Sequence, residues 1–152
     1  MKNQILEFLN ELHKNQEKYL ILAAVDDNAT SGTDMEILQA LNDVGFSLKR
    51  APGKSYIAVL NGRQIIYEKF EDMVLIYTGT VDGVRIKITS AGYESGKFFS
   101  NIWVGGEKLG ISRKRGLTIA LINRKTGKLS DWIKMDIFLG KNEIIQRKES
   151  VK

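Results

Sequence analysis

The chain has 152 residues, no cysteine, one histidine and a formal net charge of +5, from 23 lysine and arginine residues against 18 aspartate and glutamate residues. This length predicts one domain that buries about two thirds of its unfolded surface without a disulfide or a structural metal. The absence of cysteine excludes disulfides and thiolate metal sites, and the single His13 leaves histidine-rich metal centres and a Ser-His-Asp triad almost without material. We therefore expect no cofactor and no metal.

The start of the chain has no arginine-flanked apolar segment, and no run of about 18 apolar residues occurs. We expect neither a signal peptide nor a membrane span. Together with the lack of cysteine, this favours a soluble protein in a cytoplasmic or virion-associated location. The mild basic surplus favours solubility and indicates a polyanionic partner only weakly.

The first elements alternate between helix and strand. Residues 4–14 have the spacing of one apolar helical face, made of Ile5, Phe8, Leu9 and Leu12. The nearly unbroken apolar run at 19–25 is typical of a strand covered on both faces, which predicts a central position in a sheet.

An acidic turn and a second helix follow this strand. Thr33 and Glu36 have the spacing of a capping box, and Gly45 stands where a left-handed residue ends a helix. The apolar stripe of this helix is Ile37, Leu38, Leu41 and Val44. A basic loop that holds the only proline, Pro52, then leads into a short apolar strand at 56–60.

Hairpins dominate the second half of the chain. Asn61-Gly62, Val81-Asp82-Gly83 and Gly105-Gly106 predict tight turns. The intervening strands are expected at 64–67, 73–78, 84–88 and 98–104, with the charged residues E-K-F-E-D forming a loop between the first two.

Two further strands are expected at 116–123 and 128–138, joined by a loop at 124–127. Residues 140–152 carry many charges and few apolar residues, which predicts a polar tail or a frayed helix after a single domain at 1–139. The fold class is α+β, with two mostly antiparallel β-sheets flanked by two helices.

Several blocks of the sequence resemble the interleukin-like EMT inducer (PANDER-like) domain family. The blocks are R-G-L-T-I-A-L-I-N-R-K-T-G-K-L at 115–129, K-M-D-I-F at 134–138, V-D-D-N-A-T at 25–30, L-Q-A-L-N-D-V-G at 38–45, K-S-Y-I-A-V at 54–59, and I-K-I-T-S-A-G with N-I-W-V-G-G within 84–110. In the family, the block found here at 84–138 precedes the block found at 4–78. The resemblance therefore implies a circular permutation, although a segment cut from a tandem or an exchanged chain end in an oligomer would give the same order.

The resemblance implies a non-catalytic recognition module that binds carbohydrate. In sugar-binding members, the ligand lies near an arginine before the central strand, an aspartate in the V-x-D loop, and a second arginine. Carried over, the first two positions are Arg115 and Asp27, with Asp26 beside the latter. The third position holds Gly53 or Lys54, with Arg50 the nearest substitute, and the aromatic face would come from Tyr56.

Other interpretations remain open. Asp26, Asp27 and Asn28 also suit a turn that leaves a strand and satisfies loop amides, and neighbouring carboxylates on one turn do not suit a glycosidase, so we expect no enzyme. A different class is a structural or accessory domain that binds a protein partner, as a homo-oligomer or in a larger assembly such as a phage particle.

Binding of nucleic acid or of a nucleotide-like anion is a weaker alternative, through one patch formed by two basic loops: Lys108, Arg113, Lys114 and Arg115 in the first, Arg124, Lys125 and Lys128 in the second. Trp103 and Trp132 are expected in the core.

Overall fold

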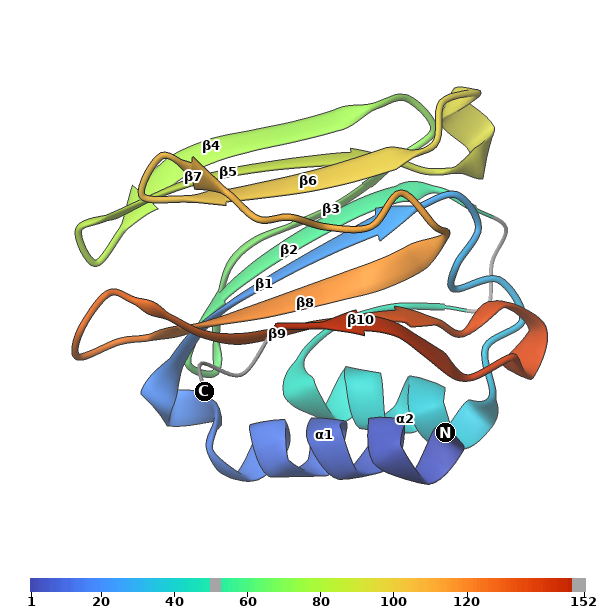
Figure 1. Ribbon diagram of the computed structural model, residues 1–152, viewed down its shortest axis with the longest axis horizontal. Helices are drawn as coiled ribbons and strands as arrows, with labels where there is room; N and C mark the ends of the chain where they lie inside the picture. The colour runs from blue at the N-terminus through green and yellow to red at the C-terminus, as the bar shows by residue number, and fades with distance from the viewer. Residues whose placement is uncertain (50–52, 149–152) are drawn as a thin grey trace.

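The computed structural model describes residues 1–49 and 53–148 (Figure 1). Two β-sheets pack face to face, and two helices cover the outer face of the larger sheet. The larger sheet has the strand order β10-β9-β8-β1-β2-β3 and the smaller one β4-β5-β6-β7. All pairs between these strands are antiparallel, which confirms the expected α+β class with two antiparallel sheets.

The elements have the following bounds. The larger sheet contains β1 (Tyr19–Asp26), β2 (Ser55–Asn61), β3 (Gln64–Glu71), β8 (Gly116–Asn123), β9 (Leu129–Asp136) and β10 (Glu143–Arg147). The smaller sheet contains β4 (Leu75–Val81), β5 (Val84–Ala91), β6 (Phe99–Val104) and β7 (Glu107–Lys108). The helices are α1 (Lys2–Lys14) and α2 (Met35–Val44), and short 3₁₀ turns occur at Gln16–Lys18, Tyr93–Ser95 and Phe138–Gly140.

The strand β1 is central, as its apolar sequence predicts. It pairs with β8 on one side and β2 on the other, and it is buried from Leu20 to Asp26. Since successive side chains point to opposite faces, β1 contributes to two cores. Ile21, Ala23 and Val25 pack under the helices, whereas Leu20, Leu22 and Ala24 pack between the two sheets.

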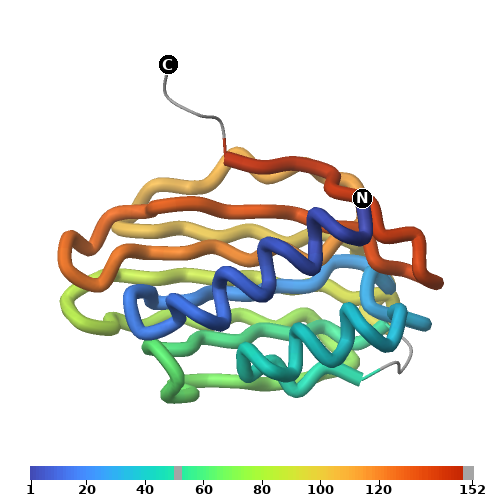
Figure 2. Tube along the Cα trace, turned by 90° about the horizontal axis from the view of Figure 1, so that it is seen from below, coloured from blue at the N-terminus to red at the C-terminus, as the bar shows by residue number. Residues whose placement is uncertain are grey.

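The two helices lie side by side across the larger sheet (Figure 2). Both apolar stripes face it: Ile5, Leu9 and Leu12 of α1 and Ile37, Leu38, Leu41 and Val44 of α2 are buried. Among the described residues, no helix is long and apolar enough to cross a membrane.

The start of α2 differs from the expected capping box. The N-cap is Asp34, whose side chain accepts hydrogen bonds from the backbone N–H groups of Glu36 and Ile37. The Thr33 hydroxyl instead donates to the carbonyl of Thr30, at 2.5 Å. An aspartate one position later serves the same purpose, and an N-cap aspartate also complements the positive end of the helix. Gly45 ends the helix with a positive φ of 121°, as predicted.

The hairpins form where glycine and asparagine predict them. Asp82 and Gly83 both have positive φ, 48° and 79°, as a type I′ turn requires. The first hairpin is shifted by one residue from the expectation, because Asn61 still pairs with Gln64 and Gly62 is the first residue of the turn.

Two expected loops are strands, which corrects the sequence analysis. The charged residues after Tyr67 continue β3 as far as Glu71, and the expected polar tail contains β10, which pairs with β9. Both are edge strands with one bulge each, so burial on one face does not impose a clean alternation of apolar and polar residues.

Candidate functional site

The two aspartates at the end of β1 lie in different surroundings. Asp26 is 1% exposed and points between the sheets, where Oδ1 accepts from the N–H of Gly116 at 3.0 Å. Its Oδ2 accepts from Nζ of Lys134 at 2.5 Å and from the hydroxyl of Ser100 at 3.2 Å. Burial raises the pKa of Asp26 above its ordinary value, and the Lys134 ammonium opposes this rise. With every contact internal, Asp26 serves the fold rather than a ligand.

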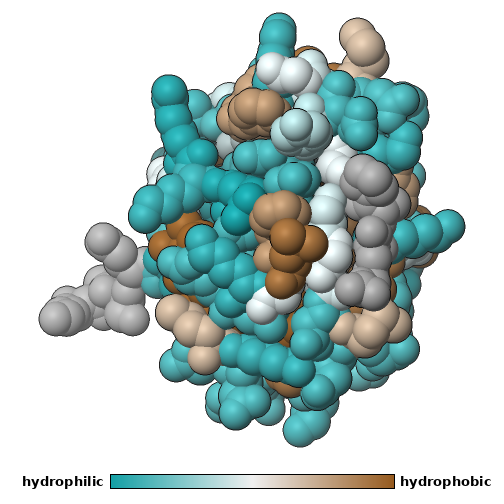
Figure 3. All heavy atoms as spheres, turned by 90° about the vertical axis from the view of Figure 1, so that its right-hand side faces the viewer, coloured by the Kyte–Doolittle hydropathy of each residue, from teal (hydrophilic) through white to brown (hydrophobic). Residues whose placement is uncertain are grey.

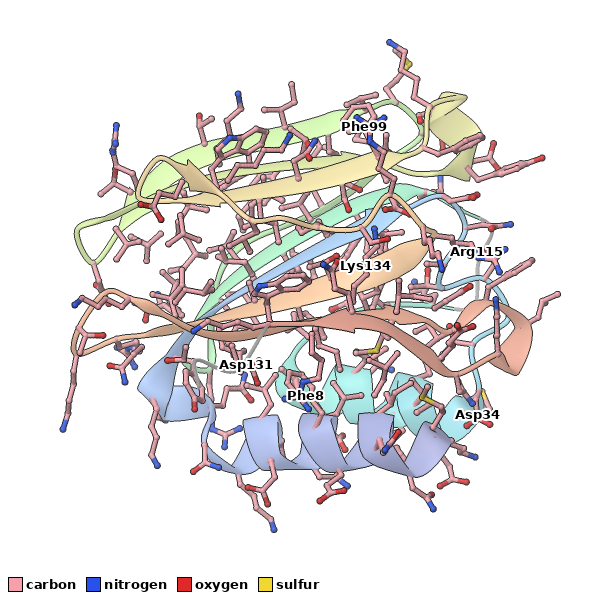
Figure 4. The ribbon with its side chains drawn as sticks, in the orientation of Figure 1. Phe8, Asp34, Phe99, Arg115, Asp131 and Lys134 are labelled. Atoms are coloured by element: carbon pink, nitrogen blue, oxygen red, sulfur yellow. The ribbon has the colours of Figure 1, made fainter. Side chains whose placement is uncertain are left out.

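Lys134 completes this buried ion pair. It comes from β9, is 0% exposed and points into the space between the two sheets (Figure 4). Its ammonium also donates to the carbonyl of Ser112 at 2.7 Å, in the segment that leads into β8. The pair therefore ties β1, β9 and that segment together at one end of the sandwich.

Asp27 turns away from the sheet with a left-handed φ of 56°. Its N–H donates to the carbonyl of Ala91 and its carbonyl accepts from the N–H of Tyr93, both at 3.1 Å, which attaches it to the end of β5. Its Oδ1 accepts from the N–H of Asn28 at 2.8 Å, a local bond of the kind that lets aspartate adopt this conformation. The side chain is partly exposed, and its Oδ2 has no hydrogen bond to a described residue.

Arg115 lies beside Asp27 in the backbone ladder, since Asp26 pairs with Gly116. Its side chain, however, is held by Asp136: Nε lies 3.0 Å from both carboxylate oxygens and Nη2 lies 2.8 Å from Oδ2. The guanidinium also stacks on Phe138, with Cζ 4.1 Å from the ring centroid. Among the described residues, no hydrogen bond or ion pair joins Arg115 to Asp27, so the structure brings their backbones together but gives the side chains separate partners.

The other expected site residues are placed as follows. Lys54 is exposed and pairs with Asp72 at 2.6 Å. Tyr56 is fully buried, with its hydroxyl donating to Glu68 at 2.6 Å, so it offers no aromatic face to a ligand. Arg50 lies outside the described residues.

The buried Tyr56 predicts a pH effect on stability. Burial and the adjacent Glu68 carboxylate raise the pKa of Tyr56 well above its ordinary value of 10.0. Because the unfolded chain releases this proton first, stability is retained below pH 10 and falls as the pH rises above it. Urea unfolding from pH 9 to 11 should show this loss in the wild-type protein, and Tyr56→Phe should make it shallower. Equal slopes for both proteins would contradict the assignment.

An exposed aromatic pair was not anticipated from the sequence. Tyr93 and Phe98 are 55% and 52% exposed, and their rings stack at 5.9 Å between centroids with an interplanar angle of 18°. Both lie in the connection between β5 and β6, where the sequence predicted a loop at Tyr93 and the first residue of a strand at Phe98. Neither prediction indicated whether these rings would pack inside or face solvent.

Tyr93 is held directly against the Asp27 loop. A Cβ on Gly53 would lie 2.5 Å from Cβ of Tyr93 and 2.9 Å from Cβ of Asn28, so three segments meet with no space for a side chain. We call the resulting area the β1-exit surface; it consists of Asp27, Asn28, Lys54, Tyr93 and Phe98. Figure 3 shows this end of the molecule, where hydrophilic side chains dominate and separate hydrophobic groups are exposed among them.

The two basic loops do not form the single patch considered from the sequence. Arg115 immediately precedes β8 and Arg124 immediately follows it, so these two residues lie at opposite ends of the strand. A rise of about 3.3 Å per residue over the nine residues from Arg115 to Arg124 separates these two by roughly 30 Å. Lys108 lies in β7 of the smaller sheet. Within residues 1–49 and 53–148, no group of three or more histidine, aspartate or glutamate side chains is placed to hold a metal ion.

Comparison with known proteins adds no relative. No protein-family model matches the chain, and neither the curated proteins nor the solved structures include a significant match.

Proposed function

We propose that this domain is a non-catalytic recognition module that binds carbohydrate at the β1-exit surface. The observation that carries the proposal is the exposed, stacked pair of Tyr93 and Phe98 held against the Asp27 loop. Membership of the interleukin-like EMT inducer family, in permuted order, is part of the same proposal and is supported by the sequence motifs alone.

The chemistry of the surface suits a sugar. An aromatic face is electron-rich and attracts the C–H groups on the apolar side of a pyranose ring. The Asp27 carboxylate has Oδ2 available to accept from a sugar hydroxyl, and the exposed Lys54 ammonium can donate to another. The Arg115 fork is already held by Asp136, so its remaining contribution to a ligand is Nη1.

The same geometry favours binding without catalysis. Asp26 is sequestered by Lys134, Ser100 and Gly116, so only one carboxylate of the acidic turn faces solvent. Glycoside hydrolysis requires two carboxyl groups about 5–9 Å apart on either side of a bound sugar. A shallow surface of this kind binds at millimolar to micromolar concentration, equivalent to about −4 to −8 kcal/mol.

A glycan array with the wild-type protein and two variants tests the proposal. Tyr93→Ala removes half of the aromatic pair, and Asp27→Asn removes the charge while keeping a side chain that tolerates a left-handed backbone. We expect reproducible binding by the wild type and, for the best glycan, a loss of about fivefold to tenfold for Tyr93→Ala, from a stacking contribution of roughly 1 kcal/mol. Asp27→Asn should also weaken glycan binding, and by more than any decrease in the folded fraction of the variant explains.

The matched control is Phe70→Ala, which removes a partly exposed aromatic ring from β3 on the edge of the larger sheet. This variant should bind glycans like the wild type. Equal losses for Phe70→Ala and Tyr93→Ala would contradict the assigned surface.

A second candidate function, a protein-interaction domain of a larger assembly, is favoured by one observation. Exposed apolar residues occur along the edge strands β3 and β4 and in the loop between them: Ile65, Ile66, Phe70, Met73 and Ile76. Exposed edge strands with apolar side chains are typical of protein contacts. If the folded wild-type protein bound no glycan on a broad array, this function would be favoured over sugar binding.

A further inference from the structure

The outer face of the four-stranded sheet carries a row of side chains that takes no part in the β1-exit surface. Cross-strand pairing aligns four residues, one from each strand: Thr78 pairs with Lys87, Lys87 with Trp103, and Trp103 with Lys108. Directly opposite residues lie on the same face of an antiparallel sheet. Ile86, Ile88 and Ile102, which alternate with these residues, pack between the sheets, so the row lies on the side of the sheet that faces away from the rest of the molecule.

Trp103 is at the centre of this row and is not in the core, which corrects the expectation from the sequence. It is partly exposed, with Nζ of Lys87 4.8 Å and Nζ of Lys108 5.5 Å from the ring centroid. The alternation of β6 explains this, since Ile102 points inward and is fully buried. Trp132, in contrast, is in the core between the sheets, as expected.

The rest of the face is cationic or neutral. The neighbouring row pairs Thr80 with Arg85, and the row on the other side aligns Ile76, Thr89 and Asn101. Phe99, the first residue of β6 and labelled in Figure 4, follows the same alternation as Trp103. By this alternation, the outward positions of β4 to β7 include the cations Arg85, Lys87 and Lys108 and no carboxylate.

A shallow depression of about 410 Å³ is located here. Trp103, Arg85, Lys87 and residues of the β4–β5 hairpin line it. Exposed cation–π contacts contribute only about 0.5–1 kcal/mol each. Phosphate groups can therefore draw the two lysines away from the indole and leave its ring for a planar partner.

We propose that this face binds single-stranded nucleic acid, with a base stacked on Trp103 and the backbone phosphates bound by Arg85, Lys87 and Lys108. Single strands are bound by surfaces that combine cations with aromatic rings, and antiparallel sheet faces with exposed aromatics are a recurrent platform. Charge complementarity requires an anionic partner, and the indole between the two lysines selects one with a planar ring beside its charges. This site is separate from the β1-exit surface.

Fluorescence anisotropy with a fluorescein-labelled 12-nucleotide oligothymidylate at 50, 100 and 200 mM KCl tests the proposal. We expect saturable binding at 50 mM KCl that weakens steeply with salt. Lys87→Ala combined with Lys108→Ala should reduce the slope of log K against log salt by about 1.4, since each phosphate contact on a single strand contributes roughly 0.7. Trp103→Ala should weaken binding about tenfold at constant salt, and Trp103→Phe should restore most of the affinity.

The matched control is Lys125→Ala combined with Lys128→Ala, which removes the same charge from the loop between β8 and β9. This variant should keep the wild-type salt slope. No binding at 50 mM KCl, or equal slopes for the two double variants, would overturn the proposal. Equal affinity of the wild type and Trp103→Ala for the oligonucleotide would also overturn it. If heparin fragments then bound tightly, the face would be a site for anionic polysaccharide instead.

Discussion

Lys134→Met is expected to lower the free energy of unfolding by about 3–5 kcal/mol, because removing one partner leaves the other charge buried without compensation. Lys134 is 0% exposed, and the Asp26 carboxylate that it neutralises is 1% exposed. Methionine has a similar length and is apolar, so the loss reports the missing ammonium rather than a cavity. Urea unfolding at pH 7 monitored by circular dichroism measures the change.

Two further variants separate the charge from the packing. Lys54→Met breaks the exposed pair with Asp72, which has nearly the same length, 2.6 Å, and should change the stability much less, because solvent screens an exposed pair. Adding Asp26→Asn to Lys134→Met removes the stranded carboxylate while keeping an oxygen for the N–H of Gly116, and should recover much of the loss. A cost for Lys134→Met no greater than that for Lys54→Met would show that the buried pair does not hold this end of the sandwich.

Periodicity identified those parts of the fold in which burial dictates the sequence. The apolar runs of β1 and β8 and the stripes of α1 and α2 could each be predicted, because burial leaves few polar residues at those positions. The edge strands β3 and β10 could not, since one of their sides meets solvent and charged residues are tolerated there. The burial of Lys134 could not be predicted either, because a lysine between apolar residues of a strand normally marks a solvent-facing position.

In the candidate site, too, the sequence predicted the position of the backbone but not the direction of the side chains. The end of β1 predicted where the acidic turn lies, and the pairing of β1 with β8 does bring Arg115 next to it. The direction of each side chain depends on tertiary partners that are distant in sequence. Asp136, 21 residues away, holds Arg115, and the hydroxyl of Tyr56 is turned to Glu68. The exposed pair of Tyr93 and Phe98 likewise depends on a distant partner, because the N–H of Tyr93 donates to the carbonyl of Asp27.

Gly92→Ala is expected to lower the free energy of unfolding by about 1–3 kcal/mol through a clash with backbone that cannot move aside. A Cβ at this position would lie 2.4 Å from the carbonyl carbon of Lys54 and 2.5 Å from the backbone nitrogen of Ser55. The backbone of Gly92 has φ −76° and ψ 174°, which alanine adopts without strain, so the cost is steric. Chemical denaturation measures it.

Gly92→Ala should affect glycan binding at the β1-exit surface more strongly than it affects the stability of the fold. Gly92 forms the bridge to Asp27, and its N–H donates to the hydroxyl of Ser55 at 2.9 Å. A displaced Gly92 therefore moves Asp27 and Tyr93 together, and glycan binding should be lost in protein that remains folded at low temperature. The control is Gly110→Ala, because a Cβ there meets no heavy atom within 4 Å and its φ is outside the left-handed region, so both stability and binding should be unchanged. Wild-type stability and binding in Gly92→Ala would mean that the close contact with Lys54 and Ser55 does not position this surface.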